Sequence, residues 1–175
     1  RRQRVDWQRE ASVDFATHRT AEGLAAYQER GDVRLSETRD EARGEIVRDY
    51  LADRDERPEG SRVAMAHRRA DVRAVNDEIR SALQERGELA KGEDAGELTF
   101  QTNDGKRSFA AGDRIVFLEN NRDLGVKNGM LGTVESVEAG RIVAQLDGPG
   151  GKGRGDSISV PMGDYQAIDH GYATT

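Results

Sequence analysis

The side chains best suited to binding a phosphate form a short basic run, His67, Arg68 and Arg69. The short run 62–66 before them predicts a strand, and the pattern after them predicts a helix. In an open sheet, ligands bind at the carboxyl ends of the strands, and a helix amino end offers N–H donors to phosphate. A phosphate site at this loop and an ordinary solvated loop both explain these three residues.

A second candidate phosphate site is the glycine-rich segment 148–156. The loop that binds nucleotide phosphates needs a lysine followed by Ser or Thr at the start of a helix. Here Lys152 is followed by Gly153, and the alternating pattern that comes next predicts a strand. The segment is therefore predicted to be a flexible hairpin loop, and the chain alone is expected not to hydrolyse nucleotide.

Composition argues against several other kinds of site. The chain has no cysteine, and its three histidines, His18, His67 and His170, lie far apart, so no metal site is expected. No apolar run approaches the ~20 residues of a membrane span, and no leader-like segment opens the chain. We therefore expect no membrane partner and a cytoplasmic location.

The charge balance limits how the chain could bind nucleic acid. The formal net charge is -6, from 27 basic and 33 acidic side chains. Binding by bulk electrostatics depends on clustered Lys and Arg, because the affinity comes from released counterions. Any contact with DNA is therefore expected to be local.

The beginning of the chain predicts two short helices. Trp7, Ala11 and Phe15 recur every four residues and form one apolar stripe. A second helix carries Leu24 and Tyr27 and ends at a glycine, which is a common helix terminator. Both helices are expected to pack their apolar residues inward.

The following segment predicts a helix, a strand and another helix. Thr38 and Glu41 form a capping-box pair at the start of a helix that stops before Pro58. The strand covers 62–66, and a helix with apolar residues at regular spacing follows over 72–83. A strand followed by a helix indicates a parallel-sheet unit.

From about residue 97 the apolar period changes from helical to alternating. The runs 98–102 and 106–109 flank Asn103-Asp104-Gly105, which predicts a hairpin. Further strands are predicted at 114–118, 131–137, 141–146 and 157–161. Short strands at this spacing favour a small barrel. The segments 165–168 and 172–175 are predicted to be extended and to lead back into a larger part of the fold. The barrel is therefore interpreted as an insertion.

The segment 112–134 carries the most specific pattern of the second half. Gly112-Asp113 turns the chain into a strand, and Gly132 allows a close backbone approach. The order of residues in 112–121 and 124–134 resembles the small SH3-like barrel inserted in the second motor domain of RecD-like helicases. The resemblance implies that this part of the chain is such a barrel.

Near the N-terminus, Arg2-Gln3 and the segment 7–12 resemble the motif that opens the second RecA-like domain of TraA-type conjugative relaxase-helicases. In that family the arginine before the glutamine reaches the terminal phosphate of the nucleotide across the interdomain cleft. The resemblance implies that Arg2 is an arginine finger, which stabilises the transferring phosphoryl group, and that Gln3 contacts the cofactor. An ordinary surface role for Arg2 also remains open.

Two further segments resemble the same family. The segment 65–76 is similar to a strand, loop and helix of the second motor domain, and 170–175 is similar to the lead-in to a helicase motif. In the family, a threonine hydroxyl at this point contacts a DNA phosphate. The resemblance therefore implies a set of DNA-binding residues: His67, Arg68, Arg69, Thr174 and Thr175.

The resemblance covers nearly the whole chain in the expected order. It implies an α/β fold in which 1–96 and 162–175 form a partial RecA-like second motor domain of the P-loop NTPase type. An SH3-like β-barrel over 97–161 interrupts this domain. The chain is expected to be a piece of a longer protein.

The implied function is that of this longer protein, which would nick plasmid DNA with a relaxase domain and unwind it as a helicase. ATP and Mg²⁺ would bind between two motor domains, with no cofactor held by this chain alone. The implied partners are single-stranded DNA, the preceding first motor domain and the conjugative secretion machinery. Two other hypotheses remain open: a vestigial helicase-like domain that binds single-stranded DNA or serves in recruitment, and a protein-interaction module built on the barrel.

Overall fold

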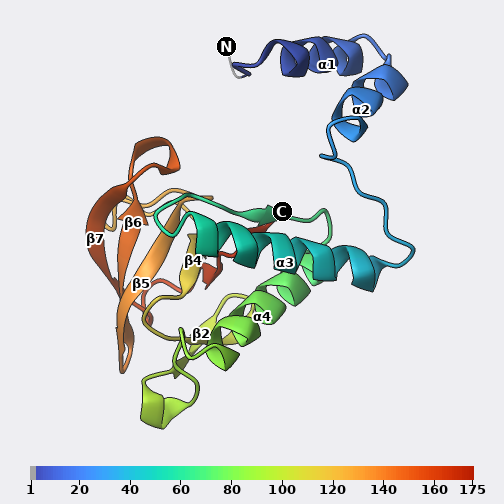
Figure 1. Ribbon diagram of the computed structural model, residues 1–175. Helices are drawn as coiled ribbons and strands as arrows, with labels where there is room; N and C mark the ends of the chain where they lie inside the picture. The colour runs from blue at the N-terminus through green and yellow to red at the C-terminus, as the bar shows by residue number, and fades with distance from the viewer. Residues whose placement is uncertain (1–2) are drawn as a thin grey trace. The chain divides into compact units, whose positions relative to one another are not determined.

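The computed structural model describes residues 3–175 and divides the chain into two compact units. The first unit extends to Ala42, and the second covers Arg43–Thr175. Each unit is built from elements that the apolar patterns predict, and Figure 1 shows their course along the chain. None of the helices in the described residues is long and apolar enough to cross a membrane.

The first unit contains α1 (Asp6–Ala16) and α2 (Thr20–Gln28). The rings of Trp7 and Tyr27 meet edge to face at 4.9 Å, and the guanidinium of Arg30 lies 4.2 Å from the Trp7 ring centre. Phe15 and Leu24, however, are 41% and 47% exposed. The prediction of inward packing is confirmed for Ala11, which is buried, and for the Trp7 and Tyr27 rings, whereas Phe15 and Leu24 keep part of their surface exposed because two short helices cover only one face of each other.

Helix α3 (Arg39–Glu56) begins with the predicted capping box. The Glu41 amide donates to Thr38 Oγ1 at 3.1 Å, and the Thr38 amide donates to the Glu41 carboxylate at 3.4 Å. These two bonds satisfy amides that have no partner inside the helix. The capping-box prediction is therefore confirmed.

The predicted parallel pair is also present. Strand β1 (Ala64–Met65) is followed by α4 (Arg69–Glu85) and pairs in parallel with β9 (Ala173–Thr174). Apolar side chains of α3, α4 and β9 form one core. Its buried members include Tyr50, Val75, Ile79, Leu83 and Tyr172.

The second half forms a hairpin and a larger antiparallel sheet. The hairpin joins β2 (Leu98–Thr102) and β3 (Gly105–Phe109), as predicted. The sheet is five-stranded, with the order β7-β6-β5-β4-β8. Its strands are β4 (Arg114–Phe117), β5 (Leu131–Glu138), β6 (Arg141–Asp147), β7 (Arg154–Pro161) and β8 (Ile168–His170). The glycine-rich segment connects β6 to β7 as a hairpin loop containing a 3-10 turn at Pro149–Gly151.

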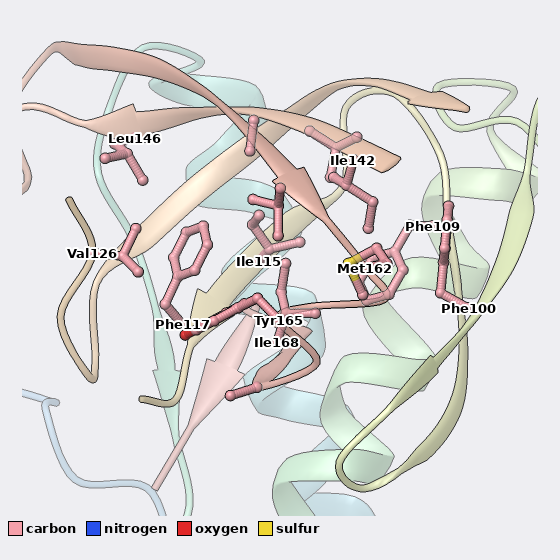
Figure 2. Close-up of a cluster of buried hydrophobic side chains, with 14 residues drawn as sticks. Phe100, Phe109, Ile115, Phe117, Val126, Ile142, Leu146, Met162, Tyr165 and Ile168 are labelled. Atoms are coloured by element: carbon pink, nitrogen blue, oxygen red, sulfur yellow. The ribbon is translucent and has the colours of Figure 1, made fainter. Parts of the chain in front are cut away.

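The core of this sheet extends past the predicted barrel boundary at residue 161. Figure 2 shows Ile115 and Phe117 of β4 beside Met162, Tyr165 and Ile168, which come after that boundary. Strand β8 belongs to the same sheet and pairs with β4. Over the described residues no strand ladder joins the edge strands β7 and β8, so a closed barrel is not confirmed. The division into a motor domain and an insert stays a prediction.

Two glycines mark places where backbones approach closely. A Cβ atom on Gly132 would lie 2.8 Å from the Gln145 carbonyl oxygen, which confirms the predicted close approach. A Cβ atom on Gly171 would lie 2.4 Å from the carbonyl carbon of Ile115. Gly171 and Tyr172 alone separate β8 from β9, so the larger sheet leads directly into the parallel pair.

Candidate functional site

A cavity of about 450 Å³ lies where α4 meets β9 and the antiparallel strands. One wall is the amino-terminal half of α4, and another is the end of β9 with Thr174 and Thr175. The remaining lining comes from β3, β4, β8 and the turn of the β2–β3 hairpin. The cavity therefore combines residues from both halves of the sequence.

The helix wall presents charged side chains at helical spacing. Arg69, Arg73 and Asp77 are four residues apart and line the same cavity. All three are exposed, and within residues 3–175 neither arginine has a side-chain hydrogen bond or an ion pair. Two guanidinium groups without a counter-ion at one wall can bind the oxygen atoms of a phosphate.

The strand wall is held to the helix by Asn76, which is buried. Its side-chain amide donates to the Ala173 carbonyl at 3.0 Å and accepts from the Ala173 amide at 2.9 Å. On its other edge, β9 bonds to β1 through the carbonyls of Tyr172 and Thr174. Asn76 therefore takes the place of a neighbouring strand and fixes where Thr174 lies relative to α4.

The parallel pairing of β1 and β9 determines which end of α4 lies next to the carboxyl end of β9. Helix α4 begins at Arg69, just after β1 ends, and β9 runs parallel to β1. The carboxyl end of β9 therefore points toward the amino end of α4. Thr174 and Thr175 lie at the Arg69 end of the cavity, and Asp77 lies farther from it.

The wall opposite α4 contains a charge pair and a buried imidazole. Arg107 of β3 donates to the Asp169 carboxylate at 3.2 Å, and His170 Nε2 donates to the Ser108 carbonyl at 2.7 Å. Asp104, in the hairpin turn, completes this side and is exposed. Because Arg107 is paired with Asp169, this wall carries less free positive charge than α4.

A buried charged cluster joins α4 to the first strand of the larger sheet. Asp113 is fully buried and receives hydrogen bonds from Arg80, from the Tyr172 hydroxyl at 2.6 Å and from the Ala110 amide at 2.8 Å. Arg80 also contacts Glu97 at 2.6 Å. Burial, reinforced by the charge and the hydrogen bond of Asp113, raises the pKa of Tyr172 well above its usual range, so the phenol stays a donor. The cluster therefore connects α4 to the start of β4 and to the segment between β8 and β9.

No group of three or more metal-ligating side chains occurs among the described residues. Besides the carboxylates of Asp77, Asp104 and Asp169, the cavity offers arginines and hydroxyls, which suit a phosphate-containing ligand.

No known family profile matches the chain. The chain is 40% identical over 174 residues to the probable conjugal transfer protein TraA of Sinorhizobium fredii, covering 99% of this chain and 15% of that protein. It is 42% identical over 179 residues to the conjugal transfer protein TraA of Rhizobium radiobacter, with the same shares covered. The chain is homologous to one segment of TraA conjugal transfer proteins. It spans about 15% of the length of these TraA relatives.

Solved structures show a weaker similarity than the TraA sequences do. Unliganded Pif1 from a Bacteroides species has a TM-score of 0.45 and 17% identity, over 66% of this chain and 41% of that chain. Bacteroides Pif1 in complex with ADP-AlF4 has a TM-score of 0.44 and 15% identity, over 82% of this chain and 40% of that chain.

The structure brings together only part of the residue set predicted from the TraA-type resemblance. Arg69, Thr174 and Thr175 line one cavity. His67 and Arg68 are exposed in the loop before α4 and do not line it. Their assignment as DNA-binding residues stays a prediction, as does that of the three residues in the cavity.

The two residues that are predicted to act on the nucleotide, Arg2 and Gln3, lie at the start of the chain. Arg2 falls outside the described residues, and Gln3 lies before α1 and is half-buried. Their roles therefore stay predictions.

Sequence reasoning missed Arg73 and Arg107 as cavity residues. Arg73 follows Arg69 at the four-residue spacing that places side chains on one helix face, so this signal was available in the sequence. Arg107 carries no such signal, because its place at the cavity depends on side-chain contacts between the hairpin and β8, which are distant in the sequence.

Proposed function

We propose that this chain is a segment of a conjugative relaxase-helicase and contributes the second motor domain to translocation on single-stranded DNA. The observation that carries the proposal is the 40% identity to TraA conjugal transfer proteins over 99% of the chain. The parallel pair β1–β9 with α4 supports a partial RecA-like domain, and the antiparallel strands support an SH3-like insert. The longer protein would act in the cytoplasm with a first motor domain and the secretion machinery.

In this proposal the cavity binds the phosphate backbone of single-stranded DNA. Arg69 and Arg73 supply forked donors without competing carboxylate partners, and the hydroxyls of Thr174 and Thr175 lie at the same end. Among the described residues that line the cavity there is no Phe, Tyr or Trp, and the imidazole of His170 is buried and bonded to the Ser108 carbonyl, so base stacking contributes little there. Contacts to phosphate position a strand without reading its sequence.

ATP and Mg²⁺ would bind between this domain and the preceding motor domain. Arg2 would stabilise the transferring phosphoryl group, and Gln3 would contact the nucleotide. The chain by itself is then expected to show no ATP turnover above background in a phosphate-release assay. Turnover that co-purifies with the wild-type chain and persists across preparations would contradict this assignment.

Replacing Arg69 and Arg73 together by alanine should weaken binding of the chain to a labelled oligo-dT. We expect about a tenfold loss at low salt and a decrease of about 1.4 in the slope of log K against log salt, because two phosphate contacts are removed. Fluorescence anisotropy over a series of salt concentrations measures both quantities. Both side chains are exposed, so the fold is expected to remain intact.

The matched control replaces Arg39 and Arg48 of α3, which are exposed and do not line the cavity. This variant has the same net charge as the Arg69 and Arg73 variant and should bind close to the wild-type level. Equal losses in the two variants would mean that the DNA contact is not located at the cavity. Oligo-dT and mixed-sequence oligonucleotides should respond alike.

A further inference from the structure

The cavity also contains two carboxylates that have no cationic partner. Asp77 of α4 and Asp104 of the β2–β3 turn are exposed and line it together with Arg69 and Arg73. Neither carboxylate takes part in an ion pair or accepts a hydrogen bond within the described residues. Asp169 differs from them, because Arg107 neutralises it. The free charge of the cavity is therefore both positive and negative.

Along α4 the two signs occupy different turns. Along α4, Arg69, Arg73 and Asp77 follow one another at successive turns, so Asp77 lies about 12 Å from Arg69 measured along the helix axis. The hydroxyls of Thr174 and Thr175 lie at the Arg69 end, as the parallel pairing requires. Asp104 lies on another wall of the cavity, in a hairpin turn where the backbone amide of Asn103 donates to the Gln166 carbonyl at 2.9 Å.

The phosphate groups of a DNA strand respond differently to the positive and the negative side chains of the cavity. Phosphates next to Arg69 and Arg73 are attracted, whereas a phosphate that continues toward Asp77 and Asp104 meets exposed negative charge. At distances of about 8–10 Å this repulsion is modest and is screened by physiological salt. It nevertheless acts on every phosphate that enters this part of the cavity.

We propose that Asp77 and Asp104 form an anionic boundary that ends the phosphate-binding part of the cavity. They confine the bound strand to the few phosphates near Arg69 and Arg73, and they keep its affinity low enough for the strand to be released. This inference rests on the proposed binding of single-stranded DNA at the cavity. According to this inference, the two carboxylates determine how many phosphates of the strand the site binds.

The test replaces both carboxylates by their uncharged isosteres, Asp77→Asn and Asp104→Asn, in the full chain. Binding of labelled oligo-dT should become about three- to tenfold tighter at low salt, and the gain should shrink as salt rises. The gain should also be larger for an oligonucleotide of about twelve nucleotides than for one of about four. A short strand occupies the arginine end alone, whereas a longer strand reaches the boundary.

The control variant carries Glu85→Gln and Asp123→Asn. Both residues are exposed, lack a side-chain partner in the described part of the chain and lie outside the cavity lining. The control changes the net charge by the same amount as the test variant. It should show a smaller gain that does not depend on oligonucleotide length.

The outcomes separate this inference from the proposed function. If the Arg69 and Arg73 variant loses binding while the Asp77 and Asp104 variant binds like wild type, the DNA site stands and the boundary is refuted. Weaker binding after Asp→Asn substitution would also refute it, because the carboxylates would then accept hydrogen bonds from the bases. An equal gain in affinity in the test and control variants would mean that the change in net charge alone explains the effect. If the wild-type chain does not bind DNA, both proposals fail.

Discussion

Replacing Asp113 by alanine should destabilise the Arg43–Thr175 unit by about 3–5 kcal/mol, because the substitution leaves a buried guanidinium without its main partner. Arg80 makes three side-chain contacts of 3.0–3.1 Å with this carboxylate. The Tyr172 hydroxyl and the Ala110 amide lose the same acceptor. Glu97 remains 2.6 Å from Nη2 of Arg80, whereas Nε of Arg80 loses the acceptor that it has in Asp113.

Urea unfolding followed by circular dichroism measures this loss. Trp7 is the only tryptophan and belongs to the first unit, so its fluorescence does not report on the second. Asp156→Ala serves as the control, because Asp156 is exposed and no side-chain partner for it occurs in residues 3–175. The control should change the free energy of unfolding by less than about 0.5 kcal/mol. A similarly small change for Asp113→Ala would show that the cluster does not stabilise the contact of α4 with the start of β4.

Replacing Asn76 by aspartate should destabilise the chain by about 2–4 kcal/mol at neutral pH and by less in acid. The new carboxylate can still accept from the Ala173 amide, but it would face the Ala173 carbonyl without a proton to donate. Burial beside that carbonyl raises the pKa of the introduced carboxyl above its ordinary value of about 3.9. Once protonated, the carboxyl donates to the carbonyl and restores both bonds.

The direction of the pH effect follows from that raised pKa. The introduced group binds its proton more tightly in the folded state, so its contribution to stability is complete below the unfolded pKa and is lost as pH rises through the folded pKa. The difference in unfolding free energy between Asn76→Asp and wild type should therefore shrink from pH 8 to about pH 4. Asn76→Ala should show a loss that does not depend on pH. Equal pH profiles for the two variants would argue against the paired hydrogen bonds to Ala173.

Features fixed by neighbouring residues could be predicted from the sequence. The capping box of Thr38 and Glu41 depends on residues three apart, and the β2–β3 hairpin depends on the turn at 103–105. Local conformational preference decides both, so the pattern in the sequence is sufficient. Phe15 and Leu24 are only partly buried, because full burial depends on a further layer, which no local pattern specifies.

The parts that escaped prediction depend on contacts between distant residues. Asn76 and Ala173 are 97 positions apart, and nothing near Asn76 indicates that its amide completes the edge of a strand. Asp113 was interpreted as part of a turn, yet it is the centre of the buried cluster. A charged Arg80 next to Ile79, on the apolar side of α4, was the available sign that a buried acceptor exists.

The short connection between β8 and β9 restricts how this sheet can be exchanged between relatives. A cassette cut at residues 97 and 161 would leave β8 behind and would remove its partner β4. Gly171 has no room for a side chain against Ile115, so a new junction cannot be placed there freely. A working chimaera would start in the exposed segment 91–96 and extend through Tyr172. Its recipient would need an arginine at the position of Arg80 to meet Asp113.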